Sequence, residues 1–338
     1  MRIALDVMGG DNAPRDIIAG GIRALKSRDD LYLTLVGKSD IINQELKQLN
    51  PPRPRVDIVD APQTIGMDES PARALRKKKN SSINLATKLV NEGRAEAFVS
   101  AGNTGAVMAA SLFNIGRLPG IKRPSIATLF PGKQGQTLLM DAGANVDCSP
   151  HNLLQFSIMG QIYADNVLGI SDPCLGLLSI GEEKKKGNQL TKNTFNLLEE
   201  DDRIHNFIGN VEGRDIFNDS CDLIICDGFI GNIVLKTTEG VASLMFDILK
   251  QIMTHNFLTR MASLILKPYM KSMMSRVDYR QYGGAPLLGV NGVVIISHGS
   301  SDATAIKNAI EVAEQTVAAD VISRIESEIQ KDGDSNDS

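Results

Sequence analysis

The sequence predicts an α/β fold in which helices cover both faces of a mostly parallel sheet. Short apolar runs with strand character alternate with helix-like runs from one end of the 338-residue chain to the other. Four of the apolar runs, at 97–100, 137–140, 223–226 and 293–296, lead directly into turns that contain glycine. Parallel strands need a crossover between them, usually a helix, so this alternation is typical of repeated βα units.

The predicted elements follow one another closely. Strands are expected over 3–7, 31–36, 97–100, 125–130, 137–140, 175–180, 223–226 and 293–296. Helices are expected after Pro14 and over 41–49, 72–79, 83–91, 153–167 and 189–199. Asp11 or Asn12 is the predicted cap of the first helix, because a short polar side chain can accept from the free N–H groups of a helix start. Strands 125–130 and 137–140 can pair as neighbours, and the proline-rich segment 51–54 reads as a loop.

The domain organisation follows from length and patterning. We expect residues 1–330 to form one two-lobed α/β unit, since the chain is too long for one simple core. The polar residues 331–338 are expected to form a disordered tail. Between 241 and 280 the strand pattern stops. This methionine-rich, basic stretch has apolar residues at helical spacing, which predicts an amphipathic helical hairpin with a kink or turn at Pro268. A pair of helices that covers a lobe or forms a dimer is an equal alternative.

Composition excludes several classes of protein. Apolar residues make up 42% and charged residues 22%, which is typical of a globular protein. The net charge of -4 disfavours non-specific nucleic-acid binding, and the absence of Trp leaves no stacking platform for single strands. Neither a signal peptide nor an apolar run of about 18 residues is present, so we expect no segment of the chain to span a membrane.

Neither a metal nor a cofactor is expected. Cys148, Cys174, Cys221 and Cys226 form no C-x-x-C pair and have no histidine at metal-ligand spacing. We interpret them as small buried hydrophobic residues in a reducing compartment. The Gly-Gly pair after the first strand is not G-x-G-x-x-G, which argues against a dinucleotide site. No covalent nucleophile is expected either, because G-x-S-x-G is absent and Cys226 lies within an apolar strand.

The glycine turns are the strongest indication of function. They lie at 101–106, 141–145, 227–232 and 298–301. A turn from a strand into a helix exposes backbone N–H groups, and the helix dipole adds partial positive charge. Such turns suit phosphate, a carboxylate or a developing oxyanion. Several of them at one edge of the sheet would form one cleft for an anionic substrate.

Polar side chains in or near these turns can act on that anion. Asn103 and Thr104 can reach a ligand, although either can also be only a helix cap. His298 is the one histidine in a glycine turn and is the best candidate for a general acid or hydrogen-bond donor. Lys185 or Lys186 follows a strand and can reach the cleft, although charge runs of this kind usually lie in solvent.

As a set, these motifs resemble the bacterial phosphate acyltransferase family, the acyl-ACP:phosphate acyltransferases of phospholipid synthesis. The resemblance is carried, in order, by 6–11, 76–82, 101–106, 120–124, 141–145, 185–188, 227–236, 283–289 and 298–301. It implies a three-layer α/β/α fold like that of the isopropylmalate dehydrogenase and phosphotransacetylase group. It also implies a cytoplasmic homodimer, peripherally associated with the membrane, that transfers a fatty acyl group from acyl carrier protein to inorganic phosphate.

On this basis we expect phosphate to attack the thioester directly, with no acyl-enzyme. The expected catalytic residues are Asn103, Lys185, Lys186, Asn232 and His298. Phosphate and acyl binding are assigned to Asp11, Thr104, Gly105, Asp141, Asn145, Gly228, Gly231, Gly299 and Ser300. The basic residues Arg73, Arg76, Lys77, Lys78 and Lys79 are expected to contact the acidic acyl carrier protein. The expected lipid face consists of Phe257, Leu258, Met261, Leu264 and Ile265, and anionic lipid would attract the basic residues around it.

Two other functions are compatible with the sequence. One is a different enzyme of the same fold group, either a short-chain phosphotransacetylase or a decarboxylating dehydrogenase. The dehydrogenase would need acidic metal ligands and a nicotinamide cofactor. The other is a non-enzymatic membrane adaptor, which would bind lipid without forming acyl phosphate.

Overall fold

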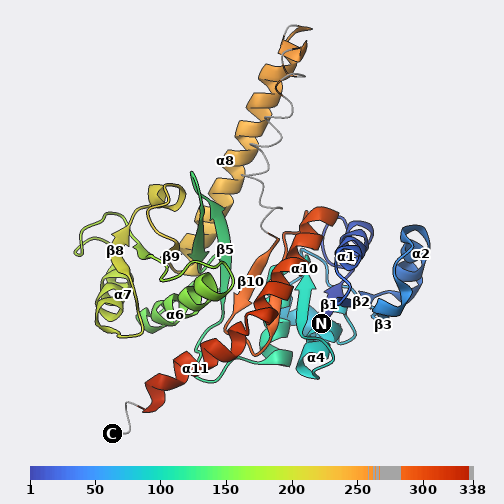
Figure 1. The fold of residues 1–338 in the computed structure, drawn as a ribbon, viewed down its shortest axis with the longest axis horizontal. Coiled ribbons are helices and arrows are strands. Elements are labelled where there is room, and N and C mark those ends of the chain that lie inside the picture. Colours follow the sequence, from blue (N-terminus) through green and yellow to red (C-terminus); the bar gives the residue numbers. More distant parts are fainter. Residues whose placement is uncertain (258, 262, 264–265, 267–282, 335–338) are drawn as a thin grey trace.

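A sheet of eleven strands runs through both lobes of the molecule (Figure 1). The computed structural model describes residues 1–257, 259–261, 263, 266 and 283–334. In spatial order the strands are β3-β2-β1-β4-β11-β10-β5-β6-β9-β7-β8. Their bounds are β1 Arg2–Asp6, β2 Tyr32–Gly37, β3 Val56–Asp60, β4 Ala97–Ser100, β5 Ser125–Pro131, β6 Gln136–Met140, β7 Leu175–Leu178, β8 Phe207–Val211, β9 Leu223–Ile225, β10 Ala285–Leu288 and β11 Val293–Ile296.

Two sets of parallel strands form the two lobes. In the first lobe β3, β2, β1, β4 and β11 are parallel, and in the second lobe β6, β9, β7 and β8 are parallel. Between them, β10 pairs antiparallel with β11, and β5 pairs antiparallel with both β10 and β6. The mostly parallel α/β sheet expected from the sequence is confirmed, and so is the pairing of 125–130 with 137–140.

The antiparallel pairings correct the expected placement of the glycine turns. Three successive pairings reverse direction between β11 and β6, so the strands of the second lobe run opposite to those of the first. The turns 101–106 and 298–301 therefore follow strands of one direction, and 141–145 and 227–232 follow strands of the other. The four turns do not share one edge of the sheet. They approach each other across the middle strands β10 and β5.

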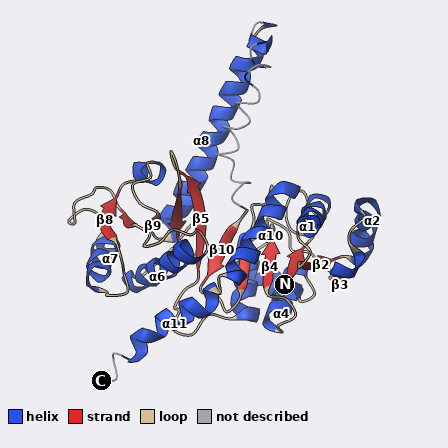
Figure 2. Ribbon diagram, viewed as in Figure 1, coloured by secondary structure: helices blue, strands red, loops and turns tan. Residues whose placement is uncertain are grey.

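Helices cover both faces of the sheet (Figure 2). Side chains of β1 alternate between the faces, because successive residues of a strand point to opposite sides. Ile3 and Leu5 pack in a cluster with residues of α1 and α10, whereas Ala4 packs with residues of α4 and α5. The helix bounds are α1 Arg15–Ser27, α2 Ser39–Leu49, α3 Pro71–Lys77, α4 Ser82–Asn91, α5 Thr104–Ala110, α6 Pro150–Asn166, α7 Gln189–Glu200, α8 Gly228–Thr254, α10 Ala303–Ala318 and α11 Val321–Asp334.

The start of the first helix, α1, and the end of the last helix, α11, differ from what the sequence predicts. Pro14 occupies the cap position of α1 and makes no side-chain cap hydrogen bond, so the predicted capping by Asp11 or Asn12 is wrong. At the other end, α11 continues to Asp334, so the first residues of the expected polar tail are helical. Residues 335–338 lie outside the described residues.

Helix α8 projects from the second lobe (Figure 1). Only Gly228 and Gly231 of this helix are buried, and Val241, Leu244 and Ile252 are each more than half exposed. Residues 241–254 of the expected hairpin segment 241–280 are thus helical, whereas residues 267–280 lie outside the described residues. In the described part of the chain, no helix is long and apolar enough to cross a membrane.

The packing of α8 on the 141–145 turn gives a first prediction. A Cβ atom at Gly231 would lie 1.9 Å from the carbonyl oxygen of Asp141, so Gly231→Ala must displace backbone. We expect it to destabilise the protein by ~1–3 kcal/mol, as overpacking does. Gly240→Ala is the matched control on the same helix, because a Cβ there meets nothing within 4 Å. Thermal unfolding should show a lower midpoint for the first variant only, and equal midpoints would contradict the packing role.

Candidate functional site

The four glycine turns meet at one pocket with a volume of about 570 Å³. The residues of these turns that line the pocket are Thr104, Gly105, Ala142, Gly143, Ala144, Asn232, His298 and Ser301. The turns therefore contribute to a common cavity, although they reach it from strands of opposite direction.

The polar groups of the pocket come mainly from α8 and from the segment after β11. Asn232, Lys236 and Glu239 are spaced so that they share one side of α8, and all three line the pocket. Lys236 Nζ lies 2.8 Å from Glu239 Oε2. The other carboxylate oxygen, Oε1, lies 3.9 Å from His298 Nε2. Glu239 thus links a lysine of the second lobe to a histidine of the first.

Much of the remaining lining is apolar. It includes Met108, Leu112, Ile126, Leu129, Leu235 and Ile296. A cavity with a few convergent polar groups against an apolar wall suits a ligand that has both an anionic part and an aliphatic part.

The buried carboxylate of Asp141 determines the shape of the 141–145 turn. Its Oδ1 accepts hydrogen bonds from the N–H groups of Ile126 at 3.1 Å, Gly143 at 3.1 Å and Ala144 at 2.9 Å. Its Oδ2 accepts from the backbone and side-chain amides of Asn145, both at 2.8 Å. Burial raises the pKa of Asp141, and these hydrogen bonds oppose that rise. Because Asp141 occupies the N–H groups expected to hold an anion, Asp141 and Asn145 support the pocket from behind rather than face it.

Asn103 is also held within the protein. Its Oδ1 accepts from the N–H of Ala106 at 3.0 Å, which caps α5. Its Nδ2 donates to the carbonyls of Met67 at 2.7 Å and Glu69 at 3.2 Å. With both ends of its amide engaged, Asn103 does not line the pocket, and the alternative interpretation as a helix cap describes it. The adjacent Thr104 and Gly105 do line the pocket.

The start of α8 is packed rather than open. The Gly228 N–H donates to the carbonyl of Asn145 at 2.8 Å, and the N–H of Ile230 donates to Asp227 Oδ1 at 2.8 Å. The N–H of Gly231 donates to the Asp227 carbonyl at 2.9 Å. These N–H groups are therefore not available to bind an anion, the role expected of the 227–232 turn. Gly228 and Gly231 instead allow α8 to approach the 141–145 turn closely.

The 298–301 turn positions His298. The Ser300 N–H donates to His298 Nδ1 at 3.2 Å, and the Ser300 hydroxyl lies 2.8 Å from the same nitrogen. In a neutral imidazole, an Nδ1 that accepts from a backbone N–H leaves the proton on Nε2, which faces Glu239. Asp11 N–H donates to the carbonyl of Gly299 at 2.7 Å, and the Asn12 amide donates to that of Ser300 at 3.0 Å. Asp11 and Asn12 thus hold this turn in place instead of capping α1.

The lysines expected at the site lie elsewhere. Lys185 and Lys186 are exposed in the loop after β7 and do not line the pocket. Among the described residues, Lys236 is the one lysine or arginine that lines the pocket. Sequence reasoning gave Lys236 and Glu239 no role, although the signal was present. They follow Asn232 by four and seven residues, the spacing of one helix face after a glycine turn.

The basic residues of 73–79 divide into two kinds. Lys78 pairs with Glu69 and donates to the carbonyl of Thr64 at 2.7 Å, so it is committed to the fold. The other four are exposed, and two of them, Arg76 and Lys79, line a smaller hollow of about 340 Å³.

Two residues of the expected lipid face are described. Phe257 is 75% exposed and Met261 is 50% exposed. The other three, Leu258, Leu264 and Ile265, lie outside the described residues.

The cysteines lack the character of nucleophiles. Burial raises the pKa of Cys226 well above its usual value, and burial raises that of Cys148 to about 11. Both are therefore thiols at neutral pH. Cys221 and Cys226 are buried, as expected for small hydrophobic residues, whereas Cys148 and Cys174 are only half-buried and correct that expectation. Among the described residues, no group of three or more His, Cys, Asp or Glu side chains is placed to hold a metal ion.

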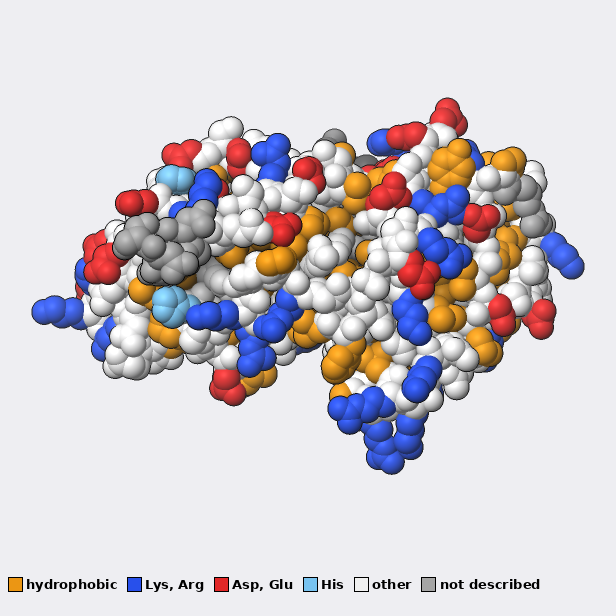
Figure 3. Space-filling model, turned by 90° about the horizontal axis from the view of Figure 1, so that it is seen from below, with side chains coloured by type: hydrophobic (Ala, Val, Ile, Leu, Met, Phe, Trp, Pro, Cys, Tyr) orange, Lys and Arg blue, Asp and Glu red, His pale blue; other side chains and the backbone are white. Residues whose placement is uncertain are grey.

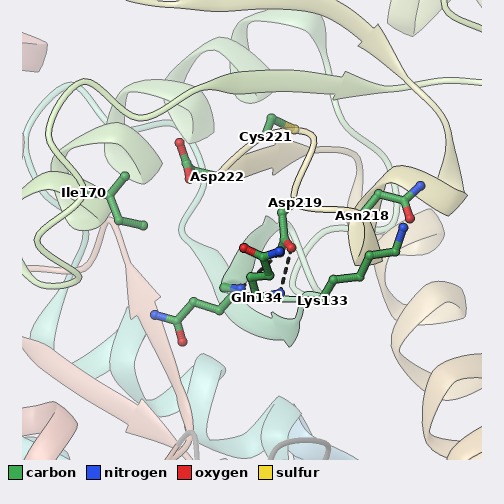
Figure 4. A pocket seen from close by; sticks show the side chains of 9 residues that line it. Lys133, Gln134, Ile170, Asn218, Asp219, Cys221 and Asp222 are labelled. Carbon is green, nitrogen blue, oxygen red and sulfur yellow. Dashed lines mark hydrogen bonds between the residues drawn. The ribbon is translucent and has the colours of Figure 1, made fainter.

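A larger hollow of about 860 Å³ lies at the turn between β5 and β6 (Figure 4). There Asp219 accepts from the N–H groups of Gln134 at 2.8 Å and Gly135 at 3.3 Å. This hollow shares no lining residue with the pocket at the glycine turns. The Asp219 carboxylate is used to fold the turn, and that of Asp222 accepts from the Cys174 N–H, so we do not regard this hollow as the functional site.

Comparison with known proteins identifies the family. Residues 1–324 match the model of the family described as fatty acid synthesis protein. The chain belongs to this family. It is 61% identical to the phosphate acyltransferase of Halothermothrix orenii over 334 residues, which cover 99% of this chain and 100% of that relative. It is 53% identical to the phosphate acyltransferase of Heliobacterium modesticaldum over 330 residues, covering 97% and 98%. The resemblance to the phosphate acyltransferases is confirmed.

Solved structures show the same architecture. A phosphotransacetylase from Streptococcus pyogenes aligns with a TM-score of 0.60 at 18% identity and covers 94% of both chains. The EutD phosphotransacetylase from Staphylococcus aureus aligns with a TM-score of 0.59 at 14% identity, covering 95% of this chain and 94% of that one. These likenesses confirm the expected phosphotransacetylase-like fold.

The contacts of Asn103 and Asn232 predict different effects of mutation. Asn103→Ala should lower stability by ~1 kcal/mol or more, because it removes both a helix cap and the bonds to the 66–69 loop. Asn103→Asp keeps the cap oxygen and loses only the amide donor, so it should fall between wild type and Asn103→Ala. Asn232→Ala removes an exposed side chain and should leave the unfolding midpoint unchanged. The midpoints of thermal unfolding of the three variants test this prediction. An unchanged midpoint for Asn103→Ala would contradict its structural role and make Asn103 a catalytic candidate again.

Proposed function

We propose that this protein transfers a fatty acyl group from acyl carrier protein to inorganic phosphate and so forms an acyl phosphate. The observation that carries the proposal is the pocket in which Asn232, Lys236 and His298 face an apolar wall. The family and the full-length identity to relatives named phosphate acyltransferase support it.

The chemistry requires little from the protein beyond positioning and charge. A phosphate oxygen attacks the thioester carbonyl carbon, and the carbonyl oxygen becomes the oxyanion of a tetrahedral intermediate. The C–S bond then breaks and the carrier leaves as a thiolate. Because a thiol has a pKa of ~8.5, this leaving group needs little protonation. Phosphate is itself the nucleophile, so the reaction needs no side-chain nucleophile. The apolar wall accommodates the acyl chain and keeps water from the reactive acyl phosphate.

The pocket residues divide these tasks. Lys236 supplies the positive charge that holds phosphate. His298 orients it through Nε2–H, and Asn232 donates its amide to the oxyanion. Glu239 lies between the lysine and the histidine, so it sets the direction of both side chains before substrate binds.

The direct test is incubation of the full-length protein with long-chain acyl-ACP and inorganic phosphate. We expect the carrier thiol and acyl phosphate to appear in equal amounts. Release of free fatty acid without acyl phosphate would identify a thioesterase instead, and no turnover at all would overturn the proposal.

Replacement of Lys236 should separate phosphate binding from acyl binding. We expect Lys236→Ala to raise the KM for phosphate and lower kcat/KM by about 10²–10³, because it removes a positive charge that lines the pocket. Lys236→Arg, which keeps the charge, should recover part of this loss. Steady-state kinetics with phosphate as the varied substrate measure the effect. If Lys185→Ala or Lys186→Ala raises this KM and Lys236→Ala does not, the charge comes from the loop after β7.

We further propose that the protein works as a homodimer at the surface of an anionic membrane. The exposed apolar side chains of α8, such as Leu244 and Ile252, are a surface that a second copy can cover. Beyond them, Phe257 and Met261 present apolar side chains near the basic residue Arg260. Apolar insertion combined with attraction to anionic lipid is the physical basis of interfacial binding. Release of acyl phosphate at a bilayer would limit its hydrolysis in bulk water.

Phe257 and Met261 test the membrane proposal. Replacement of both with Glu should release the protein from vesicles containing anionic lipid, because two charges oppose insertion and repel the lipid head groups. Acyl transfer from a soluble donor should survive, since neither residue lines the pocket. Vesicle sedimentation measures binding, and sedimentation velocity measures the oligomeric state. Loss of the dimer with no vesicle binding by the wild type would show that these residues contact protein and not lipid.

A further inference from the structure

An exposed aromatic side chain stands at a small hollow on the first lobe. Phe113 is 71% exposed and lines a hollow of about 340 Å³ together with Leu75. Three cations, Arg76, Lys79 and Lys88, also line it, and no acidic residue does. A large apolar side chain left in water among positive charges is characteristic of an interaction surface.

The cations around Phe113 are available to a partner. Arg76, Lys79 and Lys88 are all exposed. None of the three forms an ion pair with a side chain that the structure describes, whereas the neighbouring Lys78 is paired with Glu69. Figure 3 shows lysine and arginine side chains gathered beside hydrophobic ones on the underside of the molecule, where α4 lies in Figure 1. The surface is positive although the chain as a whole carries a net charge of -4.

The base of the hollow is held rigidly. The Asn114 amide donates to Asn84 Oδ1 at 3.2 Å and to Thr87 Oγ1 at 2.8 Å. The Asn84 amide donates in turn to the carbonyls of Leu75 at 3.2 Å and Lys78 at 3.0 Å. These bonds join α3, α4 and the π-helical segment Ser111–Ile115 that follows α5. A surface fixed in this way loses little conformational entropy when a partner binds.

The hollow is adjacent to the acyl-transfer pocket. Leu112 lines the pocket, and the next residue, Phe113, lines the hollow. The pocket and the hollow therefore lie on two sides of the same segment, Ser111–Ile115. Helix α3 makes a second connection. A Cβ at the pocket residue Gly105 would lie 2.6 Å from the ring of Pro71 at the start of α3, and Arg76 lies near the end of that helix. The helix has seven residues, which corresponds to a length of about 10 Å.

We propose that the hollow at Phe113, with Arg76, Lys79 and Lys88 around it, is the surface on which acyl carrier protein docks. The partner required is an acidic protein face with an apolar contact at its centre, and the carrier generally is acidic. Docking here places the thioester arm of the carrier beside the pocket. The small size of the hollow and its three cations favour one helix of a protein over the long anionic backbone of a nucleic acid. The inference rests on the proposed function for the identity of the partner.

The test measures carrier binding separately from turnover. Fluorescence anisotropy of labelled holo-ACP is recorded with the full-length protein and with Phe113→Ala, Lys79→Glu and Lys88→Glu. We expect each variant to weaken carrier binding by about tenfold or more, and the charge reversals to flatten its salt dependence. In steady-state assays the KM for acyl-ACP should rise in parallel, while the KM for phosphate and the kcat at saturating acyl-ACP stay unchanged. Arg23→Glu and Lys47→Glu, exposed cations of α1 and α2, are charge-matched controls that should bind like the wild type.

The outcomes separate the two proposals. Unchanged binding and unchanged KM in all three variants, with normal turnover by the wild type, would overturn the docking surface and leave the proposed function intact. Equal weakening by the controls would show that only the overall charge matters, and it too would overturn the surface. If the wild type forms no acyl phosphate and the variants still lose carrier binding, the docking surface stands and the proposed function is wrong. No carrier binding by the wild type would overturn the docking surface.

Discussion

The pocket depends on one buried carboxylate. Asp141 directly follows β6, and its two carboxylate oxygens accept five hydrogen bonds from Ile126, Gly143, Ala144 and Asn145. Its backbone N–H donates to the carbonyl of Cys226, the residue after β9, at 3.0 Å. Such a group is costly to bury, and only a full set of donors makes its burial tolerable. Because the donors come from β5 and from the 141–145 turn, the carboxylate fixes the middle of the sheet and the wall of the pocket together.

Because these backbone N–H groups are used within the protein, our proposal assigns recognition of the substrate to side chains. Glycine turns before helices commonly bind anions through the backbone. Here Asp141 and the Asp227 cap occupy most of those donors in the second lobe, and the glycines serve close packing. In the proposed mechanism, the positive charge and the hydrogen-bond donors come instead from Asn232, Lys236 and His298, which line the pocket. Side chains can turn toward phosphate and toward an oxyanion in succession, whereas backbone donors remain fixed.

The antiparallel strands in the middle of the sheet allow side chains of α8 to reach the pocket. Because β5 and β10 reverse the direction of the second lobe, α8 starts beside the pocket instead of at a common edge with α5. One helix therefore contributes Asn232, Lys236 and Glu239 to the pocket and then continues outward as an exposed apolar arm. The contact between Glu239 and His298 brings together residues of the two lobes, so the geometry of the site depends on how the lobes are placed.

The sequence by itself determined the α/β class, most of the elements and the four glycine turns. These features are local: strand and helix periodicity and the steric freedom of glycine act within a few residues. The family resemblance also came from the sequence. Only the tertiary structure decided that the turns meet from opposite directions, because strand direction depends on pairings between distant segments. It likewise decided that Asn103 and Asp141 support the site while Lys236 and Glu239 line it. Whether a polar residue faces a ligand or a backbone partner depends on what packs behind it, and Asn103, expected to reach the ligand, is instead held by the carbonyls of a loop more than thirty residues earlier in the chain.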